Sequence, residues 1–139
     1  MLFRRHKKPE TLTPKQKLGE RGEEAAAQYL RRNGYKVLVR RFRSKRGEID
    51  IVCRDKDWLV FVEVKTRKSE QFGVPSEAVD EKKQRHITKV ALDYLRLLDY
   101  PPVRFRFDIV EVVMSLGAEK PEEIRLYQNA FDLSEPYIY

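Results

Sequence analysis

Asp50, Glu63 and Lys65 are the residues whose types and spacing could do chemistry together. They lie on two segments that alternate like strands, residues 48–54 and 58–66. If these segments form an antiparallel hairpin, Asp50 faces Glu63, and directly opposed residues project to the same side. Lys65 shares this face because side chains alternate along a strand. One hairpin is therefore expected to present two carboxylates and one ammonium group together.

The remaining residues of the strand 48–54 are expected to follow the same alternation. Glu48 shares the face of Asp50 and lies opposite Lys65 in this register. The other face of the strand carries Ile49, Ile51 and Cys53.

A cation must compensate the two opposed carboxylates, because they repel each other and their apolar flanks add a desolvation cost. One alternative is a salt-bridge ladder between Lys65 and Glu48 on a solvated face. The other is a divalent metal: two carboxylates, a backbone carbonyl and waters form a hard oxygen site suited to Mg²⁺ or Mn²⁺. We favour the metal site, because Asp50, the hairpin and the basic surroundings occur together.

The distribution of charge indicates a polyanionic partner, most often a nucleic acid. The formal net charge is +7, and residues 1–46 hold 15 basic and 4 acidic side chains. The densest basic run, residues 40–46, encloses Phe42. Cations contact phosphates and an aromatic ring stacks on an exposed base, whereas the alternative is a solvated loop around one buried Phe. We expect nucleic-acid contacts from Arg40, Arg41, Arg43, Lys45, Arg46, Arg67, Lys82 and Arg85.

A second group of charged residues lies in the segment 104–108. Alternation places Arg104, Arg106 and Asp108 on one face. The pattern fits a second phosphate-contacting strip and a structural ladder equally well.

Capping signals and periodicity predict helices and strands in the order α-β-β-β-α-β-β. This order is typical of an α/β domain with a mixed sheet and helices packed on it. The second helix is expected to use Ser76 as its cap and to bury an inner face that extends to Leu98. The predicted helices span residues 13–33 and 76–98, and the predicted strands span 35–42, 48–54, 58–66, 103–114 and 124–129.

The first helix offers a third carboxylate. At 100° per residue, Glu23 falls at the edge of the apolar stripe that runs from Leu18 to Leu30, where it can reach the sheet. Glu20 and Glu24 fall on the solvent side of the same helix.

Length and composition indicate one domain and exclude several classes. The 139 residues predict a flexible basic arm (1–12), a single domain (13–130) and a tail (131–139). One cysteine and two distant histidines exclude a disulfide framework and a Cys- or His-rich metal site. The sequence has no secretory signal and no apolar run that could span a membrane, so we expect a cytoplasmic protein with no membrane partner.

Several separated motifs in this order resemble the bacterial YraN-like family. The resemblance covers about residues 15–115 and rests on residues 19–25, 34–35, 46–50 and 61–67. That family looks like a branch of the PD-(D/E)XK nuclease superfamily, nearest to archaeal Holliday-junction resolvases. The resemblance implies a restriction-endonuclease-like α/β fold, bound Mg²⁺ or Mn²⁺, a phosphodiester substrate and a two-fold homodimer.

The resemblance also implies a role for each matching residue. Asp50 and Glu63 would ligate the metal, with the backbone carbonyl of Val64 as a third ligand. Lys65 would orient the attacking water or stabilise negative charge in the transition state. Glu23 matches an acidic residue that resolvase-like proteins carry on the first helix, and it would bind a metal or its water shell.

Two functions follow as expectations. The first is a metal-dependent endonuclease that acts on DNA, including branched DNA; nothing in the sequence separates DNA from RNA. The alternative is a module on a nuclease-like fold that binds nucleic acid or a protein partner without cutting. The intact set of Asp50, Glu63 and Lys65 favours the nuclease.

Overall fold

A five-stranded sheet with a helix on each face forms the protein. The computed structural model describes residues 11–68 and 79–133. In chain order the elements confirm the expected α-β-β-β-α-β-β arrangement. They are α1 (Pro14–Arg32), β1 (Lys36–Ser44), β2 (Gly47–Asp55), β3 (Trp58–Arg67), α3 (Glu81–Leu97), β4 (Arg104–Val113) and β5 (Glu123–Phe131).

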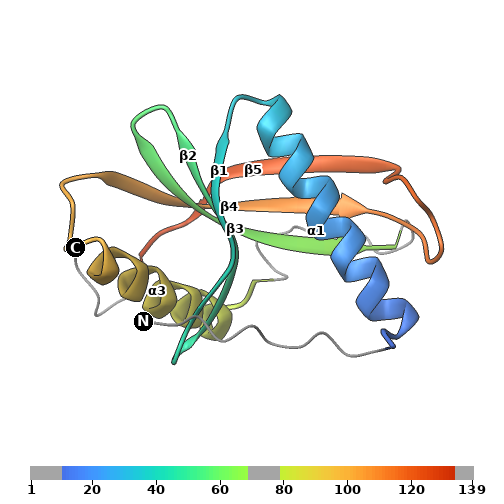
Figure 1. Ribbon diagram of the computed structural model, residues 1–139, viewed down its shortest axis with the longest axis horizontal. Helices are drawn as coiled ribbons and strands as arrows, with labels where there is room; N and C mark the ends of the chain where they lie inside the picture. Colours follow the sequence, from blue (N-terminus) through green and yellow to red (C-terminus); the bar gives the residue numbers. More distant parts are fainter. Residues whose placement is uncertain (1–10, 69–78, 134–139) are drawn as a thin grey trace.

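The strands lie in the order β1-β2-β3-β4-β5, and the sheet is mixed. All neighbours are antiparallel except β3 and β4, which are parallel and are joined by a connection that contains α3. Apolar side chains of α1 pack on one face, around Ile51, Val60 and Val110, and those of α3 pack on the other, around Phe61 and Phe107. Figure 1 shows the two helices on either side of the strands.

The sequence signals for α1 are confirmed. Thr13 and Gln16 form a capping box, with Pro14 as the first helical residue, and Asn33 caps the other end. The helix approaches β3 closely at Gly22, where an added Cβ would lie 2.0 Å from Oγ1 of Thr66. Only glycine fits this contact, which fixes the neighbouring Glu23 against the sheet.

The start and the end of α3 differ from the expectation. Its N-cap is Asp80, whose side chain accepts a hydrogen bond from the Lys83 amide at 2.8 Å. The expected cap, Ser76, lies outside the described residues. Leu98, expected on the inner face, is 47% exposed, because the helix ends at Leu97 and Leu98 forms its C-cap.

The expected alternation along β2 is wrong at Ile49. Ile51 and Cys53 pack on the α1 side of the sheet, but Ile49 packs on the α3 side. On the neighbouring strand β1, Arg41 lies between the partners of Ile51 and Ile49 and has a φ of 53°. Between Ile51 and Ile49 the apolar side chains of β2 therefore change from one face of the sheet to the other, at the position of Asp50.

The boundaries of the arm and the tail remain predictions, since residues 1–10 and 134–139 lie outside the described part of the chain. Within the described ranges, no helix is long and apolar enough to cross a membrane.

Candidate active site

The β2–β3 hairpin has the expected register from Asp55 to Ile51, but the ladder ends before the expected pairs of Asp50 with Glu63 and of Glu48 with Lys65. Its ladder runs from Asp55 opposite Trp58 to Ile51 opposite Val62. One residue further on, the Oδ2 atom of Asp50 accepts a hydrogen bond from the Val64 amide at 2.8 Å. The carboxylate therefore takes the place of a backbone acceptor where the ladder ends, next to Glu63.

Glu63 is buried, with 7% of its surface exposed. Its Oε1 atom lies 2.9 Å from the Nζ atom of Lys83, a residue in the first turn of α3. Sequence reasoning missed Lys83. The available signal was topological: a right-handed crossover from β3 to the parallel β4 brings the start of its helix near the end of β3.

Lys65 is half-buried and lies close to both carboxylates and to Lys83. Burial and the neighbouring Lys83 ammonium lower the pKa of Lys65, while Glu63 and Asp50 oppose this shift. Burial also disfavours the charged form of Lys83, but the Glu63 carboxylate outweighs it, and the pKa of Lys83 is raised. The alternative of a salt-bridge ladder between Lys65 and Glu48 is not supported, because the Glu48 carboxylate lies 3.0 Å from Arg43.

Glu23 reaches the same region from α1 and is 8% exposed. Its Oε1 atom lies 3.1 Å from Nε of Arg41 and 3.8 Å from Arg40. Glu20, expected in solvent, is partly buried and lies 3.5 Å from Arg41. We call Glu23, Asp50, Glu63, Lys65 and Lys83 the Asp50 cluster.

Asp50 is the carboxylate of this cluster that has no cation in direct contact, although the charges of Lys65 and Lys83 act on it. None of the described residues forms an ion pair with it. Burial and the negative charge of Glu63 raise the pKa of Asp50 to about 8, although the Val64 amide opposes the shift. Glu23 and Glu48 add smaller contributions in the same direction. A cation placed between these groups would relieve the repulsion.

The donor set fits a hard divalent cation in part. Carboxylate oxygens of Asp50 and Glu63 are the ligands that Mg²⁺ and Mn²⁺ prefer. Within the described ranges, no three acidic, histidine or cysteine side chains form a ready metal cage. An ion held here would therefore complete its shell with a backbone oxygen, such as that of Val64, and with water.

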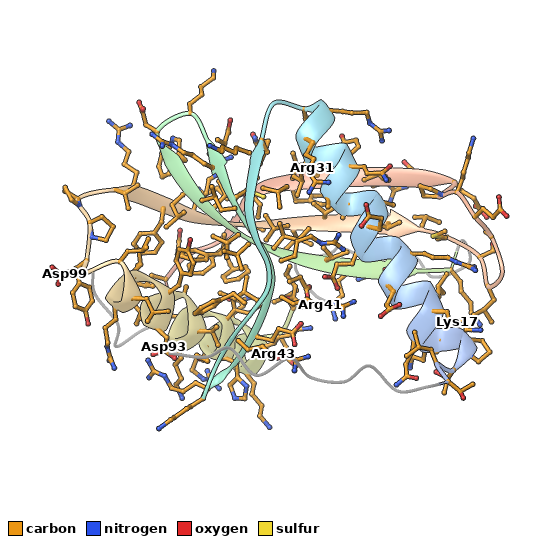
Figure 2. The ribbon with its side chains drawn as sticks, in the orientation of Figure 1. Lys17, Arg31, Arg41, Arg43, Asp93 and Asp99 are labelled. Carbon is orange, nitrogen blue, oxygen red and sulfur yellow. The ribbon has the colours of Figure 1, made fainter. Side chains whose placement is uncertain are left out.

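The residues expected to contact nucleic acid are spread over several elements, and most are ion-paired. Arg40 pairs with Glu24 as well as Glu23, and Arg46 pairs with Asp93 of α3 at 2.6 Å. Figure 2 shows Arg41 near α1, Arg43 near the tip of the β1–β2 hairpin and Asp93 on α3. Arg67 lies 3.3 Å from Glu111 and Arg85 lies 4.0 Å from Glu81, whereas Lys45 and Lys82 are exposed.

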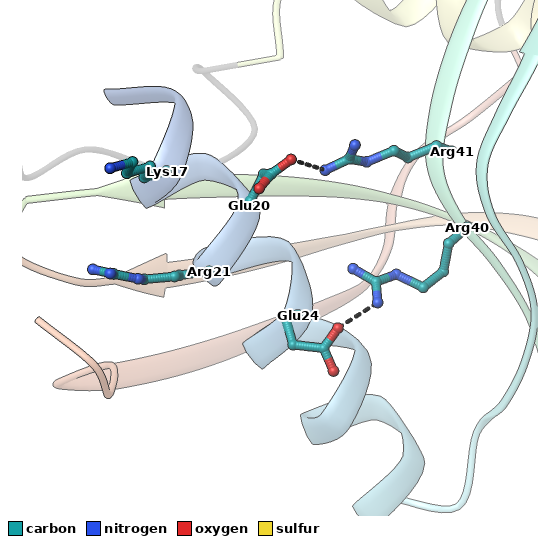
Figure 3. Close-up of a pocket in the computed structure, with 6 residues that line it drawn as sticks. All are labelled: Lys17, Glu20, Arg21, Glu24, Arg40 and Arg41. Carbon is teal, nitrogen blue, oxygen red and sulfur yellow. Dashed lines mark hydrogen bonds and ion pairs between the residues drawn. The ribbon is translucent and has the colours of Figure 1, made fainter. Parts of the chain in front are cut away.

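A shallow depression of about 470 Å³ lies between α1 and β1, beside Glu23. Figure 3 shows its six lining residues, with dashed ion pairs that join Glu20 to Arg41 and Glu24 to Arg40. The depression thus has a basic rim, and its two carboxylates are already paired with arginines. Its lining residues are Lys17, Glu20, Arg21, Glu24, Arg40 and Arg41.

The alternating segment 104–108 forms a structural ladder. Arg106 lies 3.0 Å from Asp108 and 2.8 Å from Asp55, and it donates a hydrogen bond to the Tyr35 hydroxyl at 2.9 Å. Its side chain is only 9% exposed, too buried to contact phosphate. We call Tyr35, Asp55, Arg106 and Asp108 the Arg106 network.

Fold and site define an α/β protein whose mixed sheet carries a charged cluster between its helices. Family comparison makes this specific: the chain belongs to the uncharacterised protein family UPF0102, whose model matches residues 22–112. This range includes the whole Asp50 cluster, and the expected resemblance to the YraN-like family is confirmed at this level.

Similar proteins cover nearly the same length. The UPF0102 protein of Caldicellulosiruptor saccharolyticus is 45% identical over 84% of this chain and 98% of its own. Those of Caldanaerobacter subterraneus and Geobacter sulfurreducens are 45% and 47% identical, over 96% and 90% of their lengths.

Proposed function

We propose that this protein is a divalent-metal-dependent endonuclease of PD-(D/E)XK type that hydrolyses phosphodiester bonds in DNA. The observation that carries the proposal is the position of Asp50 beside Glu63 and Lys65, with no direct ion pair to Asp50 among the described residues. Branched DNA of the Holliday-junction kind, a two-fold homodimer and a cytoplasmic location are finer parts of the same proposal.

Asp50 and Glu63 would hold Mg²⁺ or Mn²⁺, with the Val64 carbonyl as a third ligand and Glu23 on the ion or its water shell. When bound, the ion supplies Lewis-acid polarisation of a phosphoryl oxygen and lowers the pKa of a water molecule. Lys65 orients the attacking water or stabilises negative charge on the phosphoryl group, since its ammonium lies close to both carboxylates. The Val64 amide fixes the Asp50 carboxylate in place.

The test is cleavage of four-way-junction, linear duplex and single-stranded DNA, and of RNA, with Mg²⁺ or Mn²⁺ and with chelator. We expect metal-dependent cuts that Glu63→Gln and Lys65→Ala each reduce by about a thousandfold or more, with binding largely intact. Lys56→Ala, which changes one exposed lysine in the β2–β3 turn, is the matched control and should cut normally. Undiminished cleavage in either site variant would disprove the mechanism.

A binding module that does not cut is the second candidate. The observation in its favour is the Lys83 ammonium, which already lies 2.9 Å from Glu63 and compensates that carboxylate without a metal. Calorimetric titration of Mn²⁺ into the wild type and Asp50→Asn separates the candidates. Binding that the variant loses supports the nuclease, whereas DNA binding without any Mn²⁺ binding supports the module.

A further inference from the structure

Lys83 occupies a position that neither the sequence motifs nor the family match explains. It extends from the first turn of α3, where the Asp80 side chain fixes its backbone amide at 2.8 Å. Its Nζ atom lies 2.9 Å from the Glu63 carboxylate; the Glu63 side chain is buried, with 9% exposed, and the Lys83 side chain is partly buried, with 38% exposed. An ion pair so placed is screened less than one on the surface.

The charges of this region balance once Asp50 has lost its proton. When ionised, Asp50 and Glu63 carry two negative charges, which Lys65 and Lys83 offset, while Glu23 is paired with Arg41. A divalent cation would add two positive charges to a neutral group and would have to share Glu63 with the Lys83 ammonium. A phosphodiester bound beside the ion returns a negative charge and offers Lys83 a new partner.

We propose that Lys83 is a positioning residue that couples the binding of metal to the binding of a phosphodiester. In the free protein its ammonium holds Glu63. When Glu63 holds a metal, the Lys83 ammonium would leave that carboxylate and pair with an anionic phosphate of the bound strand. The inference rests on the proposed function, because it takes Glu63 as a metal ligand. Linkage requires the coupling to be reciprocal, so the same residue makes DNA binding stronger in the presence of metal.

Calorimetric titration of Mn²⁺ tests the coupling, alone and with a short duplex of nuclease-resistant phosphorothioate linkages. In the wild type the anionic duplex should tighten Mn²⁺ binding about tenfold, and a methylphosphonate duplex, which lacks the phosphate charge, should have little effect. Lys83→Met should bind Mn²⁺ alone about tenfold more tightly than the wild type, and the duplex should add at most about threefold. Lys83→Arg should restore the coupling.

Lys56→Met is the control for an equal change of net charge and should titrate like the wild type. If Lys83→Met does not fold, as judged by circular dichroism, Lys83→Gln replaces it, since an amide can still donate a neutral hydrogen bond to Glu63. Equal Mn²⁺ affinity and coupling in Lys83→Met and the wild type would overturn the inference and leave the nuclease standing. A wild type that binds no Mn²⁺ under either condition would overturn both.

Discussion

The Asp50 cluster and the Arg106 network are two groups of buried charge on one sheet, and they are completed differently. In the Arg106 network, Asp108 is fully buried and accepts hydrogen bonds from Tyr35, Arg106 and the Asn129 amide, at 2.9 to 3.1 Å. In the Asp50 cluster, Asp50 accepts a hydrogen bond from the Val64 amide and faces other carboxylates. Burial and the negative charge of Glu63 raise the pKa of Asp50 to about 8.

This difference separates a structural role from a functional one. A buried charge that is fully paired stabilises one arrangement of the chain and leaves little for a ligand to add. A partly buried carboxylate held among like charges, such as Asp50, costs stability, and a bound cation can recover that cost. Both groups contain acids and bases in close contact. What distinguishes a functional group from a structural one is therefore whether each carboxylate is paired, and not the number of charged residues.

The largest effect on stability is expected at Arg106. Arg106→Met removes the main cationic partner of Asp108 and leaves a fully buried carboxylate, so the free energy of unfolding should fall by about 3–5 kcal/mol. Urea unfolding followed by circular dichroism measures it. The matched control is Arg104→Met, an exposed residue whose guanidinium lies 5.7 Å from the Trp58 ring and whose loss should cost about 1 kcal/mol or less. Equal losses in the two variants would refute the structural role of the network.

Replacement of Asp50 is expected to raise the free energy of unfolding, opposite to the effect at Arg106. Its pKa is about 8 in the folded protein against 3.8 for the unperturbed group, so the proton stabilises the fold at low pH. That stability is complete below about pH 4 and is lost as the pH rises to about 8. Without divalent metal, Asp50→Asn should therefore match the wild type near pH 4 and exceed its unfolding free energy by at least about 1 kcal/mol at pH 8.5.

Saturating Mn²⁺ provides the control for this prediction. Metal at about 100 times its dissociation constant would stabilise the wild type by about 2.7 kcal/mol and leave Asp50→Asn largely unchanged. Thermal or urea unfolding at the two pH values, with and without Mn²⁺, gives both comparisons. A variant less stable than the wild type at pH 8.5 without metal would contradict the view that Asp50 is a strained carboxylate.

Local chemistry made much of the fold predictable. Thr13 and Gln16 mark the start of α1, and the hairpin register that places Asp55 opposite Trp58 follows from turn and alternation. Helical periodicity placed Glu23 at the edge of the apolar stripe, and it is buried at 8% exposure. These features depend on residues close in the chain, whose spacing determines their geometry.

The missed features depend on contacts between distant segments. Lys83 reaches Glu63 only because α3 starts near the end of β3, and no local pattern distinguishes it from the exposed Lys82. Ile49 changes face at the level where Arg41 of the neighbouring strand has a left-handed backbone. The partners of Arg106 could not be predicted from the sequence either, because Tyr35, which accepts its hydrogen bond, lies 71 positions away.

The smallest effect on stability is expected where a charged pair lies on the surface. Arg43 pairs with Glu48 at 3.0 Å, and both side chains are well exposed, so Arg43→Gln should change the unfolding free energy by less than about 0.5 kcal/mol. If Arg43 contacts a phosphate, the same change should lower the slope of log affinity for DNA against log salt by about one. Fluorescence anisotropy of labelled DNA at several salt concentrations, without divalent metal, measures this slope. Glu48→Gln removes the partner and spares the cation, so it should keep the slope. An unchanged slope in Arg43→Gln would exclude Arg43 from the DNA-binding surface, and the comparison of the Asp50 cluster with the Arg106 network would then have to account for function without this contact.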